Sequence, residues 1–249
     1  MKYVLLHAVD QSALTDPLPA SVEDELTEWI NEMTARGVVL DGARLRPTTD
    51  ATTVRVSDGR KVVTDGPFAE TKEQIAGYDV VECPDLDAAV AVAAAHPTTK
   101  LGCIEVREFD EGMPDPEVSE DVADGKRRYL MLVCADMRRS MAVAAENGGR
   151  EPVAEAEPDD GDDDIDRWIA DAGARRLYGW PLDFPDRAVT VRRVDGRTVT
   201  TDGPFAETKE QIAGYDLLEC DDLDDALQVA AGHPVADGGV IELRPLWQG

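Results

Sequence analysis

The sequence predicts an α+β protein in which one small domain is written twice. Residues 64–79 and 201–216 are identical (TDGPFAETKEQIAGYD), at an offset of 137 residues. The offset persists downstream, where His96-Pro97 matches His233-Pro234, and upstream, where residues 58–60 match 195–197. Such self-similarity identifies a repeated structural unit, and each copy has the pattern strand, helix, several strands, helix, strand.

The first copy opens with a strand and a helix. Residues 3–8 are apolar on both alternating faces, which is typical of a strand covered on both sides. Ser21 can cap a following helix whose apolar residues Leu26, Trp29 and Met33 recur at helical spacing. Gly37 is the expected end of that helix.

The rest of the first copy reads as strands followed by one more helix. Residues 53–56, 61–64 and 78–82 read as strands, and the dipeptide at 58–59 is a hairpin turn signal. Asp85 is positioned to cap a helix over 86–95, and Pro97 stops it. Residues 103–107 alternate as a last strand.

The second copy repeats this pattern with an insertion. Residues 129–134 form the matching first strand, and Ile165, Trp168, Ile169 and Ala172 form the matching helical stripe, closed by Gly173. Near the start the offset falls to 126, because Tyr3 matches Tyr129. About eleven extra residues are therefore expected, and the acidic stretch 151–166 is the place predicted for them.

A helix after the first strand and another before the last strand predict a ferredoxin-like repeat, whose helices cover one face of a sheet. The other face must also be buried, so the two repeats are expected to pack face to face as an intramolecular pseudo-dimer. The predicted domains are repeat 1 (1–109), a polar linker rich in Pro and Gly (110–126) and repeat 2 (127–249).

Composition excludes several classes of function. The net charge is −27, with 52 acidic residues against 25 basic ones, so neither nucleic acid nor anionic membrane is an expected partner. No apolar run approaches the ~18–20 residues of a membrane span, and no cleavage site follows the first residues. A cytoplasmic location is therefore expected, with the four cysteines reduced and buried.

Sequence motifs give no support for a metal or a cofactor. The chain has no HExxH, P-loop, GxGxxG or GxSxG motif and no Cys or His spacing typical of a metal site. The acidic run at 157–166 lacks the glycine and glutamate spacing of an EF-hand loop. We expect no cofactor and no metal.

The segment DGPFAETKE, followed by Gly-Tyr, a helix ending in His-Pro and then IEVR, resembles the DGPF branch of the YCII-related family. The resemblance covers nearly all of both copies and implies a dimeric α+β barrel. In better-studied relatives it implies a His–Asp pair in the cleft, with the Asp just before a Pro at the end of the second helix. That position holds His96 and His233 here, and the helix-1 His has no counterpart, so the pair is not carried over. The resemblance also implies a sigma factor as a possible partner.

The duplicated signature has two interpretations. It is either a rigid loop that closes the pseudo-dimer or a site for a small anionic organic ligand. The predicted ligand-binding residues are Asp65, Phe68, Glu70 and Lys72, with their counterparts Asp202, Phe205, Glu207 and Lys209. Arg107 and Arg244 join them, because each shares a strand face with a glutamate two residues earlier; an ion pair is the alternative.

The three histidines are the catalytic candidates. His96 and His233 occupy the last turn of a helix, where the helix dipole favours imidazolium, so they are either caps or general acids and bases. His7 lies on the first strand and is either a core residue or a base; its counterpart is Val133, which makes it the best base candidate if one cleft is active.

Three functions follow. The first is a small-molecule-binding or accessory regulatory protein with a cleft between its repeats. The second is an isomerase- or lyase-like enzyme that needs no cofactor and acts on a small organic acid. The third is a scaffold for a sigma factor. A partly open pocket that holds His7 or His96 near a carboxylate is the observation that would favour the enzyme.

Overall fold

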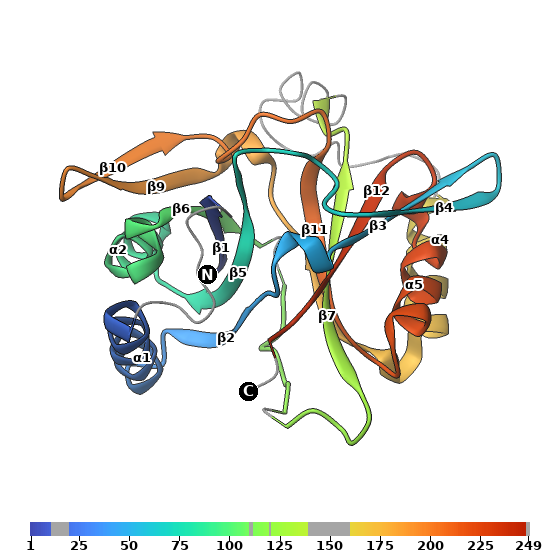
Figure 1. Ribbon diagram of the computed structural model, residues 1–249, viewed down its shortest axis with the longest axis horizontal. Coiled ribbons are helices and arrows are strands. Elements are labelled where there is room, and N and C mark those ends of the chain that lie inside the picture. Colours follow the sequence, from blue (N-terminus) through green and yellow to red (C-terminus); the bar gives the residue numbers. More distant parts are fainter. Residues whose placement is uncertain (11–19, 110–111, 120, 139–159, 248–249) are drawn as a thin grey trace.

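The computed structural model describes residues 1–10, 20–109, 112–119, 121–138 and 160–247. Two six-stranded sheets face each other, and the four helices of the described residues lie on their outer sides (Figure 1). The predicted fold class, two ferredoxin-like α+β repeats packed face to face, is confirmed. The eleven extra residues of the second copy fall largely outside the described residues. None of the described helices is long and apolar enough to cross a membrane.

Repeat 1 has eight main elements. They are β1 (Lys2–Asp10), α1 (Ala20–Ala35), β2 (Val39–Arg44), β3 (Thr52–Ser57), β4 (Arg60–Asp65), β5 (Glu73–Glu82), α2 (Leu86–Ala95) and β6 (Gly102–Glu108). Short 3₁₀ turns follow at η2 (Thr48–Asp50) and η3 (Pro97–Lys100). Strand β2 was not predicted, because its sequence VLDGAR has neither alternation nor β-branched enrichment after its first residue.

Repeat 2 contains the same elements in the same order. They are β7 (Arg127–Ala135), α4 (Asp160–Ala172), β8 (Arg176–Pro181), β9 (Val189–Val194), β10 (Arg197–Asp202), β11 (Gln211–Cys220), α5 (Leu223–Gly232) and β12 (Val240–Pro245). Its 3₁₀ turns are η4 (Gly173–Arg175), η5 (Pro185–Arg187) and η6 (Pro234–Ala236).

The two repeats exchange a hairpin. The sheet of repeat 1 has the order β10-β9-β6-β1-β5-β2, so its last two strands come from repeat 2. The sheet of repeat 2 has the order β4-β3-β12-β7-β11-β8 and takes its hairpin from repeat 1. Both hairpins extend beyond the body of the molecule, one beside α2 and one beside α5 (Figure 1). Each repeat therefore completes the sheet of the other.

The core has three layers, as the face-to-face prediction requires. The inner layer lies between the sheets and takes apolar side chains from both repeats, for example Val4 and Leu6 from β1 and Leu130 and Leu132 from β7. Two outer layers lie beneath the helices, one in each repeat. All four cysteines are free and buried, as expected.

Most predicted helix ends are confirmed, and one is wrong. The Asp85 side chain accepts a hydrogen bond from the backbone N–H of Ala88 at 2.8 Å and so caps α2. Gly37 has φ of 67° and ends the turn after α1. Ser21 does not cap α1, because Ala20 before it is already helical.

A β-bulge in β5 sets which side chains face the helices. His7 pairs with Gly77 and Ala8 pairs with Ile75, so Ala76 is the extra residue. Ile75 and Tyr78 both pack in the inner layer although they are three residues apart, which a regular strand would not allow. Beyond the bulge, Asp79 lies on the helix-covered face together with His7.

Candidate functional site

His7 and Asp79 meet on the helix-covered face of the first sheet. His7 is near the end of β1, and Asp79 is two residues past the bulge on the neighbouring strand β5. His7 Nε2 lies 2.9 Å from Asp79 Oδ2. Both side chains are nearly buried, with exposed fractions of 8 % and 7 %. A buried carboxylate beside an imidazole is the arrangement that orients a catalytic histidine.

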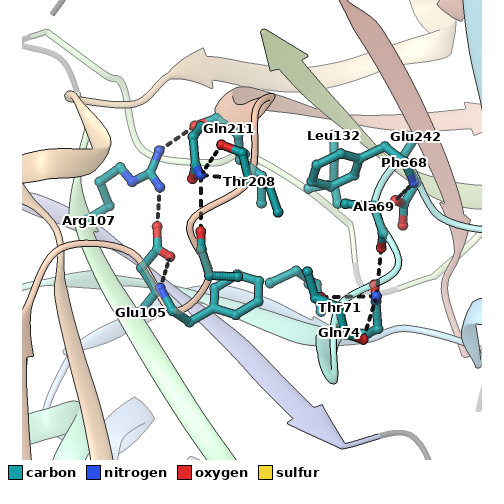
Figure 2. A pocket seen from close by; sticks show the side chains of 14 residues that line it. Phe68, Ala69, Thr71, Gln74, Glu105, Arg107, Leu132, Thr208, Gln211 and Glu242 are labelled. Atoms are coloured by element: carbon teal, nitrogen blue, oxygen red, sulfur yellow. Dashed lines mark hydrogen bonds and ion pairs between the residues drawn. The ribbon is translucent and has the colours of Figure 1, made fainter. Parts of the chain in front are cut away.

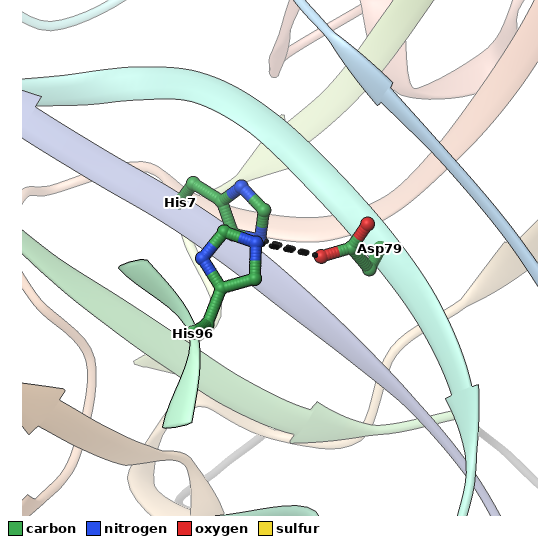
Figure 3. A group of neighbouring side chains, drawn as sticks. All are labelled: His7, Asp79 and His96. Carbon is green, nitrogen blue, oxygen red and sulfur yellow. Dashed lines mark ion pairs between the residues drawn. The ribbon is translucent and has the colours of Figure 1, made fainter. Parts of the chain in front are cut away.

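His96 completes the group from a third element. It ends α2 and begins η3, and its Nε2 lies 3.5 Å from the same Asp79 oxygen. Figure 3 shows both imidazoles directed at this carboxylate. The rings of His7 and His96 are 4.4 Å apart between centroids, and Trp29 packs edge-on against His96. The cap interpretation of His96 is thus confirmed, but its other ring nitrogen faces Asp79.

A backbone hydrogen bond decides the tautomer of His96. The Thr98 N–H donates to His96 Nδ1 at 3.1 Å, so that nitrogen carries a lone pair. The neutral ring then carries its proton on Nε2 and points it at Asp79. If Asp79 also accepts the Nε2 proton of His7, the free lone pair of His7 is on Nδ1. This is the nitrogen that points away from Asp79 in Figure 3.

The contacts in this cluster are close but not aligned. His7 Nε2, Asp79 Oδ2 and His96 Nε2 are buried, and none of them has a partner in good hydrogen-bond geometry. Active-site hydrogen bonds are often loose before substrate binds and tighten in the complex. The three groups are therefore held close by their elements, with room to realign.

Burial and charge shift the pKa values of this cluster. Burial alone would raise the pKa of Asp79, but the adjoining His7, assisted by His96, holds that pKa below its ordinary value. Burial, with His7 adding to it, lowers the pKa of His96 to about 3. The predicted imidazolium at His96 is therefore wrong: loss of hydration outweighs the helix dipole, and His96 is neutral near pH 7.

A pocket of about 240 Å³ opens above the three residues. It lies inside repeat 1, between α1 and the sheet. Its lining is largely apolar and includes Val22, Leu26, Ile30 and Leu101, with Arg44 supplying a positive charge. The Arg44 guanidinium also stacks on Trp247 at 5.1 Å from the ring centroid. A small molecule with an apolar body and an anionic end fits this combination.

Gly77 keeps the space beside His7 open. A Cβ at this position would lie 3.3 Å from His7 Nδ1 and 2.9 Å from the carbonyl oxygen of Ala43. Both the strand pairing and the access to Nδ1 would then have to change. The duplicated segment thus ends with two residues that shape this site. Gly77 leaves open space beside His7 Nδ1, and Asp79 supplies the carboxylate.

A second, wider groove of about 860 Å³ lies between the repeats, where residues 121–126 cross from one to the other. It adjoins the pocket of repeat 1 at Gly42, Ala43 and Arg44, which line both. The cleft expected between the repeats is thus present, but the histidine–carboxylate cluster lies in the neighbouring pocket under α1.

Repeat 2 holds the same aspartate with different partners. Asp216 corresponds to Asp79, but Val133 replaces His7. Arg176, which corresponds to Val39, pairs with Asp216 at 2.6 Å. His233 caps its turn as His96 does, accepting from the Val235 N–H at 3.1 Å. Burial and the nearby Arg176 lower its pKa to about 4, so it is also neutral.

His7, Asp79 and His96 could also be considered as metal ligands. Their donor atoms lie within 4.8 Å of one another, and two imidazoles with a carboxylate suit a divalent transition metal. The Thr98 hydrogen bond opposes this use, because it leaves the proton of neutral His96 on the nitrogen that would have to bind the metal. The arrangement therefore favours acid–base chemistry over metal binding.

The signature loops lie between the repeats. The Phe68 N–H donates to Glu242 of repeat 2 at 2.9 Å, and the Phe205 N–H donates to Glu105 of repeat 1 at 3.0 Å. Figure 2 shows the two loops facing each other across a cavity of about 20 Å³, which has room for about one water. The backbone contacts of these loops join the two halves of the molecule.

The other predicted ligand-binding residues lie at two extremes of exposure. Arg107 and Arg244 are buried, and each pairs with the glutamate two residues earlier on its own strand. The polar residues of the loops are exposed at the surface: Asp65, Glu70, Lys72, Asp202, Glu207 and Lys209. Ligand binding by these residues stays a prediction.

Asp79 was not among the residues predicted from the sequence. It is the last residue of the duplicated segment and directly follows the Gly-Tyr pair that carries the family resemblance. The available signal was the asymmetry of the first strand: His7 has no counterpart, so the partner of His7 should be sought on the strand that pairs with it. That pairing depends on the fold.

Comparison with known protein families agrees with the duplication. The model of the YCII-related domain matches residues 1–111 and 137–248. An uncharacterised protein of Rhizobium meliloti (strain 1021) is 51 % identical over 69 residues, which is 26 % of this chain and 54 % of that protein. The chain thus spans about half the length of this relative. A crystal structure provisionally described as a chlorite dismutase covers 99 % of this chain and 94 % of its own, with 12 % identity and a TM-score of 0.41.

Proposed function

We propose that this chain, which belongs to the YCII-related domain family, is an acid–base enzyme of isomerase or lyase type that acts on a small organic acid in repeat 1. One observation carries the proposal. His7 Nε2 lies 2.9 Å from the buried carboxylate of Asp79 at the floor of a pocket of about 240 Å³. A histidine oriented by a carboxylate in an apolar pocket is suited to proton transfer.

His7 is the general base of this proposal. Its Nδ1 takes a proton from a carbon next to a carbonyl group, and the electron pair of the broken C–H bond forms an enolate. An isomerase returns the proton to a different carbon, whereas a lyase expels a group from the neighbouring carbon. Asp79 orients the imidazole and stabilises the imidazolium, and His96 holds Asp79 by its Nε2 proton.

Arg44 and the apolar lining define the substrate class. Arg44 on β2 can pair with a substrate carboxylate, while Val22 and Leu26 of α1 contact an apolar body. The volume of about 240 Å³ is below the range of pockets that hold drug-sized ligands, about 300–1,000 Å³, so a small substrate is expected. The substrate expected is a small keto or hydroxy acid with an apolar side chain.

Deuterium exchange tests this function without knowledge of the natural substrate. A panel of small carbonyl-containing acids is incubated with the protein in D₂O, and loss of the C–H signal is followed by NMR. The expected result is exchange at the carbon next to the carbonyl for at least one acid. His7→Val, which installs the residue of repeat 2, should lower its rate by roughly 10²- to 10⁴-fold.

Two matched variants control for folding and for symmetry. His7→Gln keeps a donor for Asp79 but has no basic nitrogen, so it should fold and lose exchange. Val133→His should add no exchange in repeat 2, because Arg176 already holds Asp216. Acids that raise the melting temperature without any exchange would contradict the enzyme and favour a binding protein. Unchanged exchange in both His7 variants would also contradict it.

A further inference from the structure

Repeat 2 contacts the backbone beside the candidate site of repeat 1 through one buried arginine. Arg244 lies on β12, and its Nη1 donates to the carbonyl oxygen of Ile75 at 2.8 Å. Ile75 flanks the bulge of β5, two residues before Gly77. A bulge leaves part of the strand ladder without its regular partner, and a buried carbonyl requires another donor. Arg244 is this donor.

The same guanidinium contacts the segment that follows β2, a strand that lines the pocket. Arg244 Nη2 donates to the carbonyl oxygen of Arg46 at 2.6 Å, two residues after Arg44 at the end of β2. Glu242 holds the guanidinium from its own strand at 3.2 Å. Arg244 is fully buried, so water cannot replace these hydrogen bonds. One side chain from repeat 2 therefore joins β5 to the segment that follows β2 in repeat 1.

We propose that Arg244 is a positioning residue for the catalytic pair: it fixes the bulge of β5 and thereby keeps Asp79 on the face where His7 lies. This inference rests on the proposed function. Successive side chains of a strand alternate between faces, so loss of the bulge would turn Asp79 toward the inner layer and away from His7. The pseudo-dimer then has a catalytic role, because repeat 2 supplies a residue that repeat 1 needs.

The internal symmetry provides a matched control. Arg107 of repeat 1 pairs with Glu105 and donates to the carbonyl oxygen of Ile212, at the equivalent bulge of β11. Arg107 is as buried as Arg244, with an exposed fraction of 1 %. Its bulge lies beside Asp216, which has no histidine partner across the strand. Each arginine pairs with a glutamate and donates to the carbonyl oxygen of an isoleucine at a bulge, but only Arg244 adjoins the catalytic pair.

The experiment compares Arg244→Lys with Arg107→Lys. Lysine keeps the positive charge but cannot donate to both carbonyls in the fixed geometry of guanidinium. The chain has three histidines, so ¹⁵N-labelled histidine gives three ring systems that single substitutions assign. Proton–nitrogen couplings report the tautomer of each ring without any substrate. Deuterium exchange is measured on the same samples.

We expect Arg244→Lys to shift the His7 ring signals, to mix its two tautomers and to lower exchange at least tenfold. Arg107→Lys should leave the His7 signals and the exchange rate unchanged. Equal changes in both variants, or no change of His7 in Arg244→Lys, would overturn the proposal. Glu242→Gln and Glu105→Gln, which keep each arginine but weaken its anchor, form the second matched pair if a lysine variant does not fold.

The two proposals fail in different ways. If His7→Val keeps full exchange while Arg244→Lys still shifts the His7 signals, the enzymatic function is wrong and the positioning of His7 by Arg244 stands. If His7→Val abolishes exchange while Arg244→Lys changes neither signal nor rate, the function stands and the positioning role is wrong.

Discussion

Asp79 and Asp216 occupy the same position on β5 and β11, in segments of identical sequence, yet they have different partners. Asp79 faces the imidazole of His7 at 2.9 Å, beneath a pocket. Asp216 faces the guanidinium of Arg176 at 2.6 Å. A guanidinium cannot exchange protons near neutral pH, whereas an imidazole can. The comparison teaches that two positions outside the duplicated segment, 7 and 39, separate a carboxylate that faces an imidazole from one held in an ion pair with arginine.

The largest effect is expected when repeat 1 is given the ion pair of repeat 2. In Val39→Arg, the new guanidinium should pair with Asp79 as Arg176 pairs with Asp216 and separate it from His7. Deuterium exchange should then fall by at least ~10²-fold, the range for removal of general base catalysis.

Two further variants interpret that result. Val39→Gln adds similar bulk without charge and should lose less activity, which separates pairing from filling of the pocket. Arg176→Val should not change exchange, because repeat 2 has no His7. Full exchange in Val39→Arg would break the comparison, since Asp79 would then tolerate the partner of Asp216.

An intermediate effect is expected from the two buried neutral histidines. The pKa values of His96 and His233 are lowered to about 3 and about 4, mainly by burial. Below pH 6.5 the unfolded chain binds protons at these rings and the folded chain does not, so falling pH favours unfolding. As the pH falls below 6.5, each histidine should lower the free energy of unfolding by about 1.4 kcal/mol per pH unit. This loss should end near pH 4 for His233 and near pH 3 for His96.

Urea unfolding between pH 7 and pH 4 measures this slope. His96→Asn and His233→Asn keep an acceptor for the backbone N–H of the following turn and remove the titrating ring. The two histidines together contribute to the slope of the free energy of unfolding against pH. Each variant should remove about half of that contribution. An unchanged slope in both variants would show that neither ring is kept neutral by the fold.

The smallest effect is expected in the signature loops. Lys72 and Lys209 are exposed and do not line the pocket of repeat 1. Lys72→Ala and Lys209→Ala should each change the free energy of unfolding by no more than about 0.5 kcal/mol and leave exchange unaltered. If either variant abolishes the thermal stabilisation by a small acid, the anion site predicted for these loops is present.

Much of the fold could be predicted from the sequence because it depends on local patterns. Alternation identified β1 and β6, helical spacing and Asp85 identified α2, and the duplicated segment identified the two repeats. Strand β2 and the bulge could not be predicted. The sequence of β2 has no strand periodicity, and the carbonyl of Ile75 beside the bulge has its donor, Arg244, on the other sheet.

Two of the three clustered residues could be predicted. His7 and His96 were candidates because imidazole titrates near neutral pH and because His7 lacks a counterpart in repeat 2. Asp79 was missed, and the charge state of His96 was wrong, since both depend on burial and on strand pairing. A residue 72 positions away in sequence became the neighbour of His7 only when β1 paired with β5.

The sequence by itself determined the duplicated α+β architecture and the family, because repeats, caps and apolar periodicity act through neighbours along the chain. Only the tertiary structure decided three other features: the exchange of hairpins between the sheets, the meeting of His7, Asp79 and His96, and the hold of repeat 2 on the bulge of repeat 1. These features depend on contacts between segments that are distant in the sequence. Strand pairing and side-chain burial decide which of these segments meet. Identical segments in the two repeats therefore have different partners, His7 for Asp79 and Arg176 for Asp216.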